Sequence, residues 1–258
     1  YAVGDCCQNT DLLTGLPCYV PLGSTANKHG RVAAINICGG DATFPGVLAS
    51  SICKVFDYGV ARTGLTEEAA TAAGFDVVTA LTPAPDREHF MPNAKTIMLK
   101  LVVDRKTRRI LGVQGVGQGE VSKRIDVAAT AITGGLTVDQ VSNLDLCYAP
   151  PYSAAIDNIG AAANVALNKL DGMFLGIGAA TVNQWLSERR DFIFLDVRNY
   201  PEHARVRLPG STLIPLGTLR GRLAELPKDR VVVTFCSVGL KGYEAALILQ
   251  AAGFDSVR

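Results

Sequence analysis

The sequence predicts two domains of different fold class: an α+β domain built on an antiparallel sheet with helices, then an α/β domain with a parallel sheet. In residues 41–150 the strand patterns come first and most helical patterns follow, which is typical of α+β folds. In residues 171–258 helical and strand patterns alternate, which is typical of a parallel sheet with helical crossovers. Asp171-Gly172 forms the hinge between the two regions.

The first part of the chain, residues 1–40, predicts a strand end, a loop and one helix. The strand end covers residues 1–5, and the helix has Ser24 or Thr25 as its N-cap and ends near Cys38. Because the sequence starts without methionine inside an expected strand, we expect position 1 to be the edge of a fragment.

Residues 41–150 contain the strands of the first domain. Strands are predicted at 51–56, 75–81, 95–103 and 109–116, and the last two form a hairpin. Helices are predicted after Thr66, over residues 120–133 and from about Thr137. The glycine-rich run 115–119 resembles a nucleotide-binding loop, but it follows a hairpin and lacks a βαβ setting, so we expect a tight turn there.

The remainder of the chain begins with an irregular segment. Two prolines exclude regular structure in residues 147–153, and an alanine-rich helix is expected over 157–170. Beyond the hinge, helices are predicted at 182–189, 219–226 and 243–252, and strands at 192–197, 212–214, 231–235 and 255–257. Because the chain stops as the last strand begins to pair, we expect a covering helix to be missing and this domain to be truncated at its C-terminus.

The composition argues against several classes of partner and ligand. Apolar residues make up 48% of the chain and charged residues 19%, and the net charge of +1 offers no footprint for nucleic acid or an anionic membrane. No apolar run is long enough to span a bilayer. Seven cysteines, without C-x-x-C spacing or a signal peptide, indicate a reducing, cytoplasmic setting. Three scattered histidines give no support for a metal site.

The clearest candidate for chemistry is Cys236, in the segment that joins a predicted buried strand to a helix. Backbone N–H groups of such a loop and the N-terminus of the helix converge on the sulfur, and Lys241 adds a cation. Both effects favour the thiolate, which is the nucleophilic form. The alternative is a buried structural cysteine, but Gly239, Lys241 and Gly242 inside the loop favour a reactive thiol.

Three motifs in this region resemble the rhodanese family over about residues 175–258. They are Phe194-Leu195-Asp196-Val197-Arg198, Leu208-Pro209-Gly210-Ser211 and the loop from Cys236 to Gly242. The resemblance implies that Cys236 carries a persulfide sulfur and that Asp196 and Arg198 shape the site. Lys241 stands where many relatives have arginine, so bidentate contact to an oxyanion donor is lost. Gly242 stands where the related tyrosine phosphatases need arginine, so phosphatase activity is not expected.

The N-terminal residues resemble another family, the pyridine nucleotide–disulfide oxidoreductases. Residues 1–6 are similar to that family's last flavin-contact strand, whose aspartate bonds the ribityl chain and is matched by Asp5. Residues 22–31 are similar to the helix entry that faces the flavin pyrimidine end, which makes Ser24, Thr25 and Ala26 the matching cofactor-binding residues. The resemblance implies FAD and NAD(P)H as cofactors of the full-length protein, with neither site complete in this chain.

The middle of the chain resembles the dimerisation domain of coenzyme A disulfide reductases and related NADH oxidases. Lys123-Arg124-Ile125-Asp126 and Tyr148-Ala149-Pro150-Pro151-Tyr152-Ser153 carry this resemblance. It implies a homodimer through residues 41–170, Tyr148 at the disulfide site of the partner subunit, and coenzyme A as a further ligand. By themselves, Tyr148 and Tyr152 could be packing aromatics at a proline-rich corner. A second tyrosine of those enzymes is matched here by Phe90, which favours persulfides or polysulfides as substrates.

The resulting hypothesis divides the chain into three parts. Residues 1–40 are the residual end of a FAD-binding domain, residues 41–170 a dimerisation domain and residues 171–258 a rhodanese-like domain. We expect the C-terminal portion of a FAD- and NAD(P)H-dependent coenzyme A disulfide or persulfide reductase, joined to a sulfurtransferase for small sulfur or thiol compounds. Without a Rossmann motif in context or a redox-cysteine element, this chain alone is expected to lack reductase activity. The alternative is a non-catalytic dimerisation and binding module with an inert rhodanese-like domain.

Overall fold

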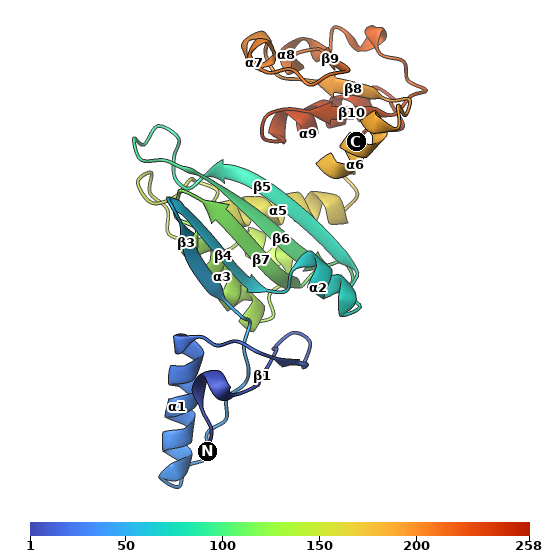
Figure 1. The fold of residues 1–258 in the computed structure, drawn as a ribbon. Helices are drawn as coiled ribbons and strands as arrows, with labels where there is room; N and C mark the ends of the chain where they lie inside the picture. The colour runs from blue at the N-terminus through green and yellow to red at the C-terminus, as the bar shows by residue number, and fades with distance from the viewer. The chain divides into compact units, whose positions relative to one another are not determined.

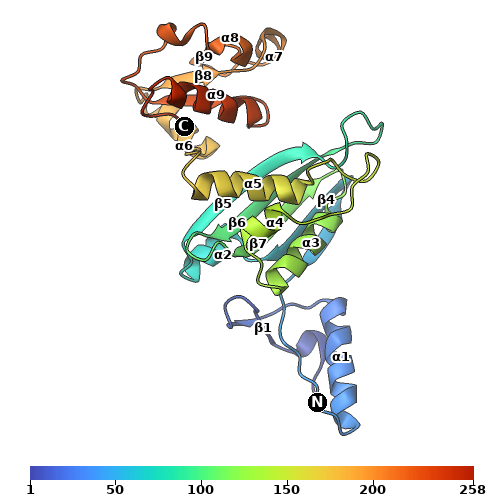
Figure 2. The same ribbon diagram turned by 180° about the vertical axis from the view of Figure 1, so that it is seen from behind.

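The computed structural model describes residues 1–258 as two compact units, residues 1–167 and residues 168–258. Figure 1 and Figure 2 show the ribbon from opposite sides. The first unit contains an antiparallel sheet with helices, and the second contains a parallel sheet, so both predicted fold classes are confirmed. No helix in either unit combines the length and the apolar character needed to cross a bilayer.

The N-terminal segment is built around one long helix. Its elements are η1 (Gly4–Cys6), β1 (Asn9–Thr10), β2 (Pro17–Cys18) and α1 (Gly23–Ile37). The predicted strand at residues 1–5 is wrong, because Gly4 has a φ of +84° and turns the chain into η1. The predicted N-caps are also wrong. The N-cap of α1 is Leu22, which makes no side-chain capping bond, and Ser24 and Thr25 lie inside the first turn.

The first unit is organised by a five-stranded sheet with the order β3-β4-β7-β6-β5. The strands are β3 (Ser51–Val55), β4 (Tyr58–Gly64), β5 (Val77–Pro85), β6 (Thr96–Asp104) and β7 (Ile110–Gly117). The sequence did not predict β4, since Gly59 and Gly64 weaken its strand pattern. The expected tight turn at 115–119 is wrong for Gly115 and Gly117, which belong to β7. A Cβ on Gly117 would lie 2.7 Å from Cα of Ile97, so this glycine permits the close approach of β7 to β6.

Three helices of the first unit lie on one face of this sheet, as Figure 2 shows. They are α3 (Ser122–Thr133), α4 (Val138–Ser142) and α5 (Asn158–Leu170), while α2 (Glu67–Ala72) follows β4 in the chain. Thr66 caps α2 as predicted, and α4 starts near Thr137 as predicted, with Thr137 as its cap. Each threonine side chain accepts a backbone N–H. The sequence places Val121, Ile125, Ala128 and Ile132 on one apolar face of the helix predicted over 120–133, which is α3, and all four are buried.

The second unit is a three-stranded parallel sheet with the order β10-β8-β9. The strands are β8 (Ile193–Asp196), β9 (Ser211–Leu213) and β10 (Val232–Phe235), and the helices are α6 (Ala179–Ser187), α7 (Tyr200–Arg205), α8 (Leu216–Leu219), η2 (Leu223–Glu225) and α9 (Leu240–Ala251). The predicted helix at 219–226 is wrong, because α8 ends before Gly221 and the chain continues as η2. The predicted strand at 255–257 is reduced to one bridge between Val257 and Val232.

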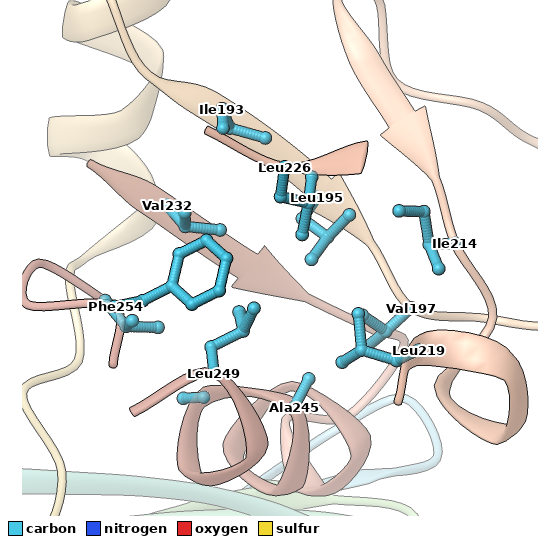
Figure 3. Packing of buried hydrophobic residues seen from close by; sticks show 12 residues of the cluster. Ile193, Leu195, Val197, Ile214, Leu219, Leu226, Val232, Ala245, Leu249 and Phe254 are labelled. Atoms are coloured by element: carbon cyan, nitrogen blue, oxygen red, sulfur yellow. The ribbon is translucent and has the colours of Figure 1, made fainter. Parts of the chain in front are cut away.

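The apolar core of the second unit fixes both ends of one loop. Figure 3 shows Leu195 of β8, Val232 of β10 and Leu249 of α9 in the same cluster, and all three are fully buried. Cys236 packs against this cluster from its edge. Because β10 and α9 share one core, the segment between them, residues 236–239, is anchored at both ends.

Candidate functional site

Cys236 directly follows β10 and opens the loop that leads into α9. Its thiol is half-buried and forms no disulfide. The backbone N–H of Gly239 donates a hydrogen bond to Sγ of Cys236 over 3.1 Å. Gly239 has a φ of +102°, which L side chains rarely adopt. The turn therefore places a backbone donor on the sulfur, an arrangement that stabilises negative charge.

Gly242 holds the first turn of α9 against β10. Its carbonyl oxygen accepts a hydrogen bond from Oγ1 of Thr234 over 2.9 Å. A Cβ on Gly242 would lie 3.5 Å from Cα of Phe235 and 3.7 Å from the backbone N of Cys236. The helix therefore starts close to the cysteine, and its N-terminus contributes a favourable field for an anion.

The ammonium of Lys241 is paired with a carboxylate that the sequence did not single out. Nζ of Lys241 lies 3.0 Å from Oε2 of Glu202, and Oγ of Ser237 donates to Oε1 of the same side chain over 2.9 Å. The hydrogen bond from the backbone N–H of Asn199, together with those from Lys241 and Ser237, lowers the pKa of Glu202 to about 2. Glu202 is therefore an ionised carboxylate that holds Ser237 of the cysteine loop and Lys241 of α9.

Asp196, at the end of β8, and Arg198 form an ion pair close to the cysteine loop. Asp196 is fully buried and accepts hydrogen bonds from Nη2 and Nε of Arg198, over 2.7 and 2.9 Å. Nδ1 of His203 lies 3.0 Å from the same carboxylate. Burial raises the pKa of Asp196, but the hydrogen bonds from Arg198 and His203 outweigh it, so the net pKa lies below its ordinary value. The guanidinium also lies over the ring of Phe235, 5.6 Å from the centroid, next to Cys236 in the chain.

The predicted flavin-contact residues lie together in the N-terminal segment: Asp5, Ser24, Thr25 and Ala26. A Cβ on Gly4 would lie 3.5 Å from Cβ of Ala26, which shows that η1 packs on the first turns of α1. Asp5 and Ser24 are exposed, whereas Thr25 is buried. Because α1 begins without a side-chain cap, its positive end suits an anionic or polar ligand group.

Tyr148 lines a surface pocket of about 440 Å³ in the first unit. The other side chains that define this pocket include Arg87, Glu120, Lys123, Cys147 and Tyr152. The hydroxyl of Tyr148 lies 3.5 Å from Oε1 of Glu88, an oxygen that also accepts the backbone N–H of Ala155 over 3.0 Å. Tyr148 and Phe90 are both exposed.

A buried ionic network holds the walls of this pocket. Arg124 of α3 is fully buried and donates to both carboxylate oxygens of Asp157, over 3.2 and 2.8 Å. It also donates to the backbone carbonyl of Asp86 over 2.7 Å. The buried carboxylate of Asp86 accepts from Arg87 and from two backbone N–H groups. Burial raises the pKa of Asp86, and these hydrogen bonds more than reverse that rise.

The predicted site residues fall into two groups, one in each unit of the structure. Around the loop of the second unit lie Cys236, Gly239, Lys241, Gly242, Asp196 and Arg198. The flavin-contact residues and Tyr148 belong to the first unit. Glu202, His203 and Glu88 escaped prediction. The spacing Asn199-x-x-Glu202 is typical of a helix capping box and could have revealed α7. No local pattern links Glu88 to Tyr148, because they are 60 positions apart.

Two family models match the chain. Residues 50–159 match the dimerisation domain of the pyridine nucleotide-disulphide oxidoreductases. Residues 179–258 match the rhodanese-like domain.

Individual relatives match over one or both of these regions. The NAD(P)H sulfur oxidoreductase (CoA-dependent) of Pyrococcus furiosus is 44% identical over 165 residues, which cover 64% of this chain and 37% of that protein. The coenzyme A disulfide reductase of Staphylococcus aureus is 33% identical over 62% of this chain and 36% of its own. The solved structure of a NAD-dependent persulfide reductase from A. fulgidus is 48% identical, with a TM-score of 0.93, over 100% of this chain and 46% of that one. The chain therefore spans less than half the length of these relatives.

Proposed function

We infer the function of this chain from the two families to which it belongs, the pyridine nucleotide-disulphide oxidoreductases through the dimerisation domain at residues 50–159 and the rhodanese-like proteins through residues 179–258. The first family is flavin-dependent, and its dimerisation domain implies assembly through this region. We assign residues 1–40 as the end of a FAD-binding domain, 41–170 as the dimerisation domain and 171–258 as the rhodanese-like domain.

The rhodanese-like domain transfers sulfane sulfur through Cys236 in this proposal. The thiolate attacks the sulfane sulfur of a donor, a new S–S bond to Sγ forms, and the donor's own bond breaks with its electron pair on the leaving sulfite or thiolate. An acceptor nucleophile then takes the terminal sulfur, and the electron pair of the broken S–S bond returns to Sγ. The observation that carries this proposal is the hydrogen bond from the Gly239 N–H to Sγ, which suits a thiolate or persulfide anion.

The loop's other residues have defined parts in the same reaction. Gly239 supplies the backbone geometry that no L side chain adopts easily, and Gly242 brings the start of α9 close to the sulfur. The ion pair between Asp196 and Arg198 holds the guanidinium of Arg198 over Phe235, the last residue of β10. Lys241 lies beside the loop, with its charge directed at Glu202.

We propose that the whole protein is a FAD- and NAD(P)H-dependent reductase of coenzyme A disulfides or of persulfides and polysulfides, as the names of its relatives suggest. The exposed carboxylate of Asp5 and the uncapped start of α1 fit a flavin, which Asp5, Ser24, Thr25 and Ala26 would hold. When bound, a flavin supplies the electrons that reduce a disulfide or persulfide. Substrates of this kind would also load or unload Cys236.

Tyr148 serves the reducing site of the partner subunit in this proposal. Its exposed hydroxyl, next to Glu88, can donate a proton to a thiolate that leaves during reduction. Phe90, at the position of the second tyrosine in coenzyme A disulfide reductases, has no hydroxyl to offer. This difference favours a persulfide or polysulfide over a bulky disulfide.

Sulfur transfer by this chain is tested by thiocyanate formation from thiosulfate and cyanide. We expect the wild-type chain to form thiocyanate and the variant Cys236→Ser to form none above background. Cys53→Ser, on the exposed strand β3, is the matched control and should keep the wild-type rate. A wild-type rate equal to that of Cys236→Ser would refute the proposal.

A further inference from the structure

Two cations lie near Cys236, and each is paired with a carboxylate. Arg198 donates from Nε and Nη2 to the carboxylate of Asp196 and also from Nη2, over 2.8 Å, to the backbone carbonyl of Val206. Lys241 lies 3.0 Å from Glu202. The pKa of Arg198 is raised, first by the hydrogen bonds to Asp196 and further by the charges of Glu202 and Cys236, so these groups act on one another electrostatically. The positive charges of Arg198 and Lys241 are therefore largely balanced by the carboxylates of Asp196 and Glu202.

Glu202 is placed to control this balance. Its carboxylate accepts hydrogen bonds from Lys241 of α9, Ser237 of the cysteine loop and the backbone N–H of Asn199, over 3.0, 2.9 and 3.1 Å. One side chain thus connects α7, the loop and α9. Asn199 in turn caps α7 by accepting the backbone N–H of Glu202 over 2.8 Å, so the position of the carboxylate is set by a capping box.

We propose that Glu202 is a positioning residue that weakens the preference of the site for doubly charged sulfur donors, because it fixes Ser237 and neutralises Lys241 at the mouth of the cysteine loop. This inference deepens the proposed sulfur transfer and rests on it. With Lys241 neutralised, the loop gains no advantage from a second negative charge on the donor. Singly charged sulfane compounds, such as organic persulfides, are then accepted as readily as the thiosulfate dianion.

Two donors with the same reaction but different charge separate this effect from simple loss of structure. Thiosulfate carries two negative charges and leaves as sulfite, whereas methanethiosulfonate carries one and leaves as methanesulfinate. In both cases Sγ of Cys236 forms a new S–S bond, the donor's S–S bond breaks, and its electron pair goes to the leaving group. A purely structural defect at the loop slows both reactions by the same factor.

The test uses the full 258-residue chain with Glu202→Gln. Glutamine keeps the shape and one carbonyl oxygen for the capping box. It removes the negative charge, and its NH2 group replaces the second acceptor oxygen with a donor that the Ser237 hydroxyl can accept. The ratio of kcat/KM for thiosulfate to that for methanethiosulfonate should rise about three- to tenfold, the size expected when one unit charge is exposed near the donor. The double variant Glu202→Gln with Lys241→Gln should return to the wild-type ratio. Glu225→Gln, which breaks the exposed pair with Arg222 on η2, is the matched control and should leave the ratio unchanged.

A second measurement does not depend on sulfur transfer. The rates at which anionic iodoacetate and neutral iodoacetamide alkylate Cys236 are compared by peptide mass spectrometry, and Glu202→Gln should raise their ratio by a similar factor. An unchanged alkylation ratio, or a rise that persists when Lys241 is also replaced, would overturn the role of Glu202. A raised alkylation ratio in a chain whose wild type turns over neither donor would support the charge effect at the thiol and refute the sulfur-transfer proposal instead.

Discussion

The backbone N–H of Gly239 points at Sγ of Cys236 and lies 3.1 Å from it. Gly239 has a φ of +102°, which glycine adopts readily, and the chain turns at this residue from the cysteine loop into α9. The sulfur is consequently held by main-chain geometry, whereas the cationic side chain of Lys241 is bonded to Glu202. The chemistry of the loop therefore depends first on a glycine and only secondarily on a lysine.

Replacement of Gly239 by alanine should impair sulfur transfer much more than folding. A Cβ at this position meets no atom within 4 Å, so the cost is conformational, about 1–2 kcal/mol for an L residue in the left-handed region. We expect kcat/KM to fall by at least about tenfold as the loop relaxes and the N–H turns away. Gly217→Ala, at an open position without positive φ, is the control for both thiocyanate assays and thermal unfolding. Equal activity of the two variants would contradict this role.

Removal of the buried guanidinium of Arg124 should destabilise the first unit. Arg124→Met removes the guanidinium that pairs with the buried carboxylate of Asp157 and donates to the carbonyl of Asp86, and breaking such a buried pair costs about 3–5 kcal/mol. Chemical denaturation measures the loss. The control, Arg105→Met, breaks an exposed pair with Asp76 and should cost at most about 1 kcal/mol. Similar losses for both variants would show that the buried network does not hold the pocket.

The stability of the second unit should depend on pH through Asp196. Its pKa is lowered in the folded state, so the ionised carboxylate stabilises the fold above the unfolded value of about 3.9, and this contribution is lost as the pH falls through the lower folded value. Asp196→Asn should therefore unfold more easily at neutral pH and show a smaller loss of stability below about pH 4. Denaturation at pH 7 and pH 3 measures both effects; a parallel pH dependence of the two proteins would exclude this contribution.

Tyr148→Phe should slow reduction but not sulfur transfer. Loss of a proton donor at a leaving thiolate typically costs at least about 100-fold in rate, and the complete flavin-containing protein is required to measure it. Thiocyanate formation by Cys236 in the same preparation should be unchanged. Tyr58→Phe on β4 is a suitable control, because Tyr58 lies outside the pocket that Tyr148 lines. An unchanged reductase rate in Tyr148→Phe would leave packing as the role of this side chain.

The sequence predicted those parts of the fold that depend on local patterns. Thr66 and Thr137 mark helix starts through short-range capping bonds, and the alternation around Leu99 marks β6 as a strand. Strand β4 was missed because its glycines weaken the local pattern and its conformation is decided by neighbouring strands. Gly117 illustrates this: it reads as a turn residue, but close contact with Ile97 explains why it is a strand residue. Helix α7 was missed although its capping box is a local signal.

The residues of the site around Cys236 could be predicted from the sequence, whereas the contacts between their side chains could not. A cysteine between a buried strand and a helix, with glycines around it, identifies the loop around Cys236 from the sequence. The partner of Lys241 does not follow from the sequence, because Glu202 lies 39 positions away on a helix that the pattern did not reveal. The same holds for the contact between Asp196 and His203, which requires α7 to fold back on β8.

The most direct test of the account is the mass of the peptide that contains Cys236, measured after incubation with thiosulfate and again after addition of cyanide. The account predicts that the donor adds the mass of one sulfur atom to this peptide alone, and that cyanide removes it with formation of an equal amount of thiocyanate. A peptide that never gains sulfur, or a gain that is spread equally over the other six cysteines, would contradict the assignment of Cys236 as the sulfur carrier.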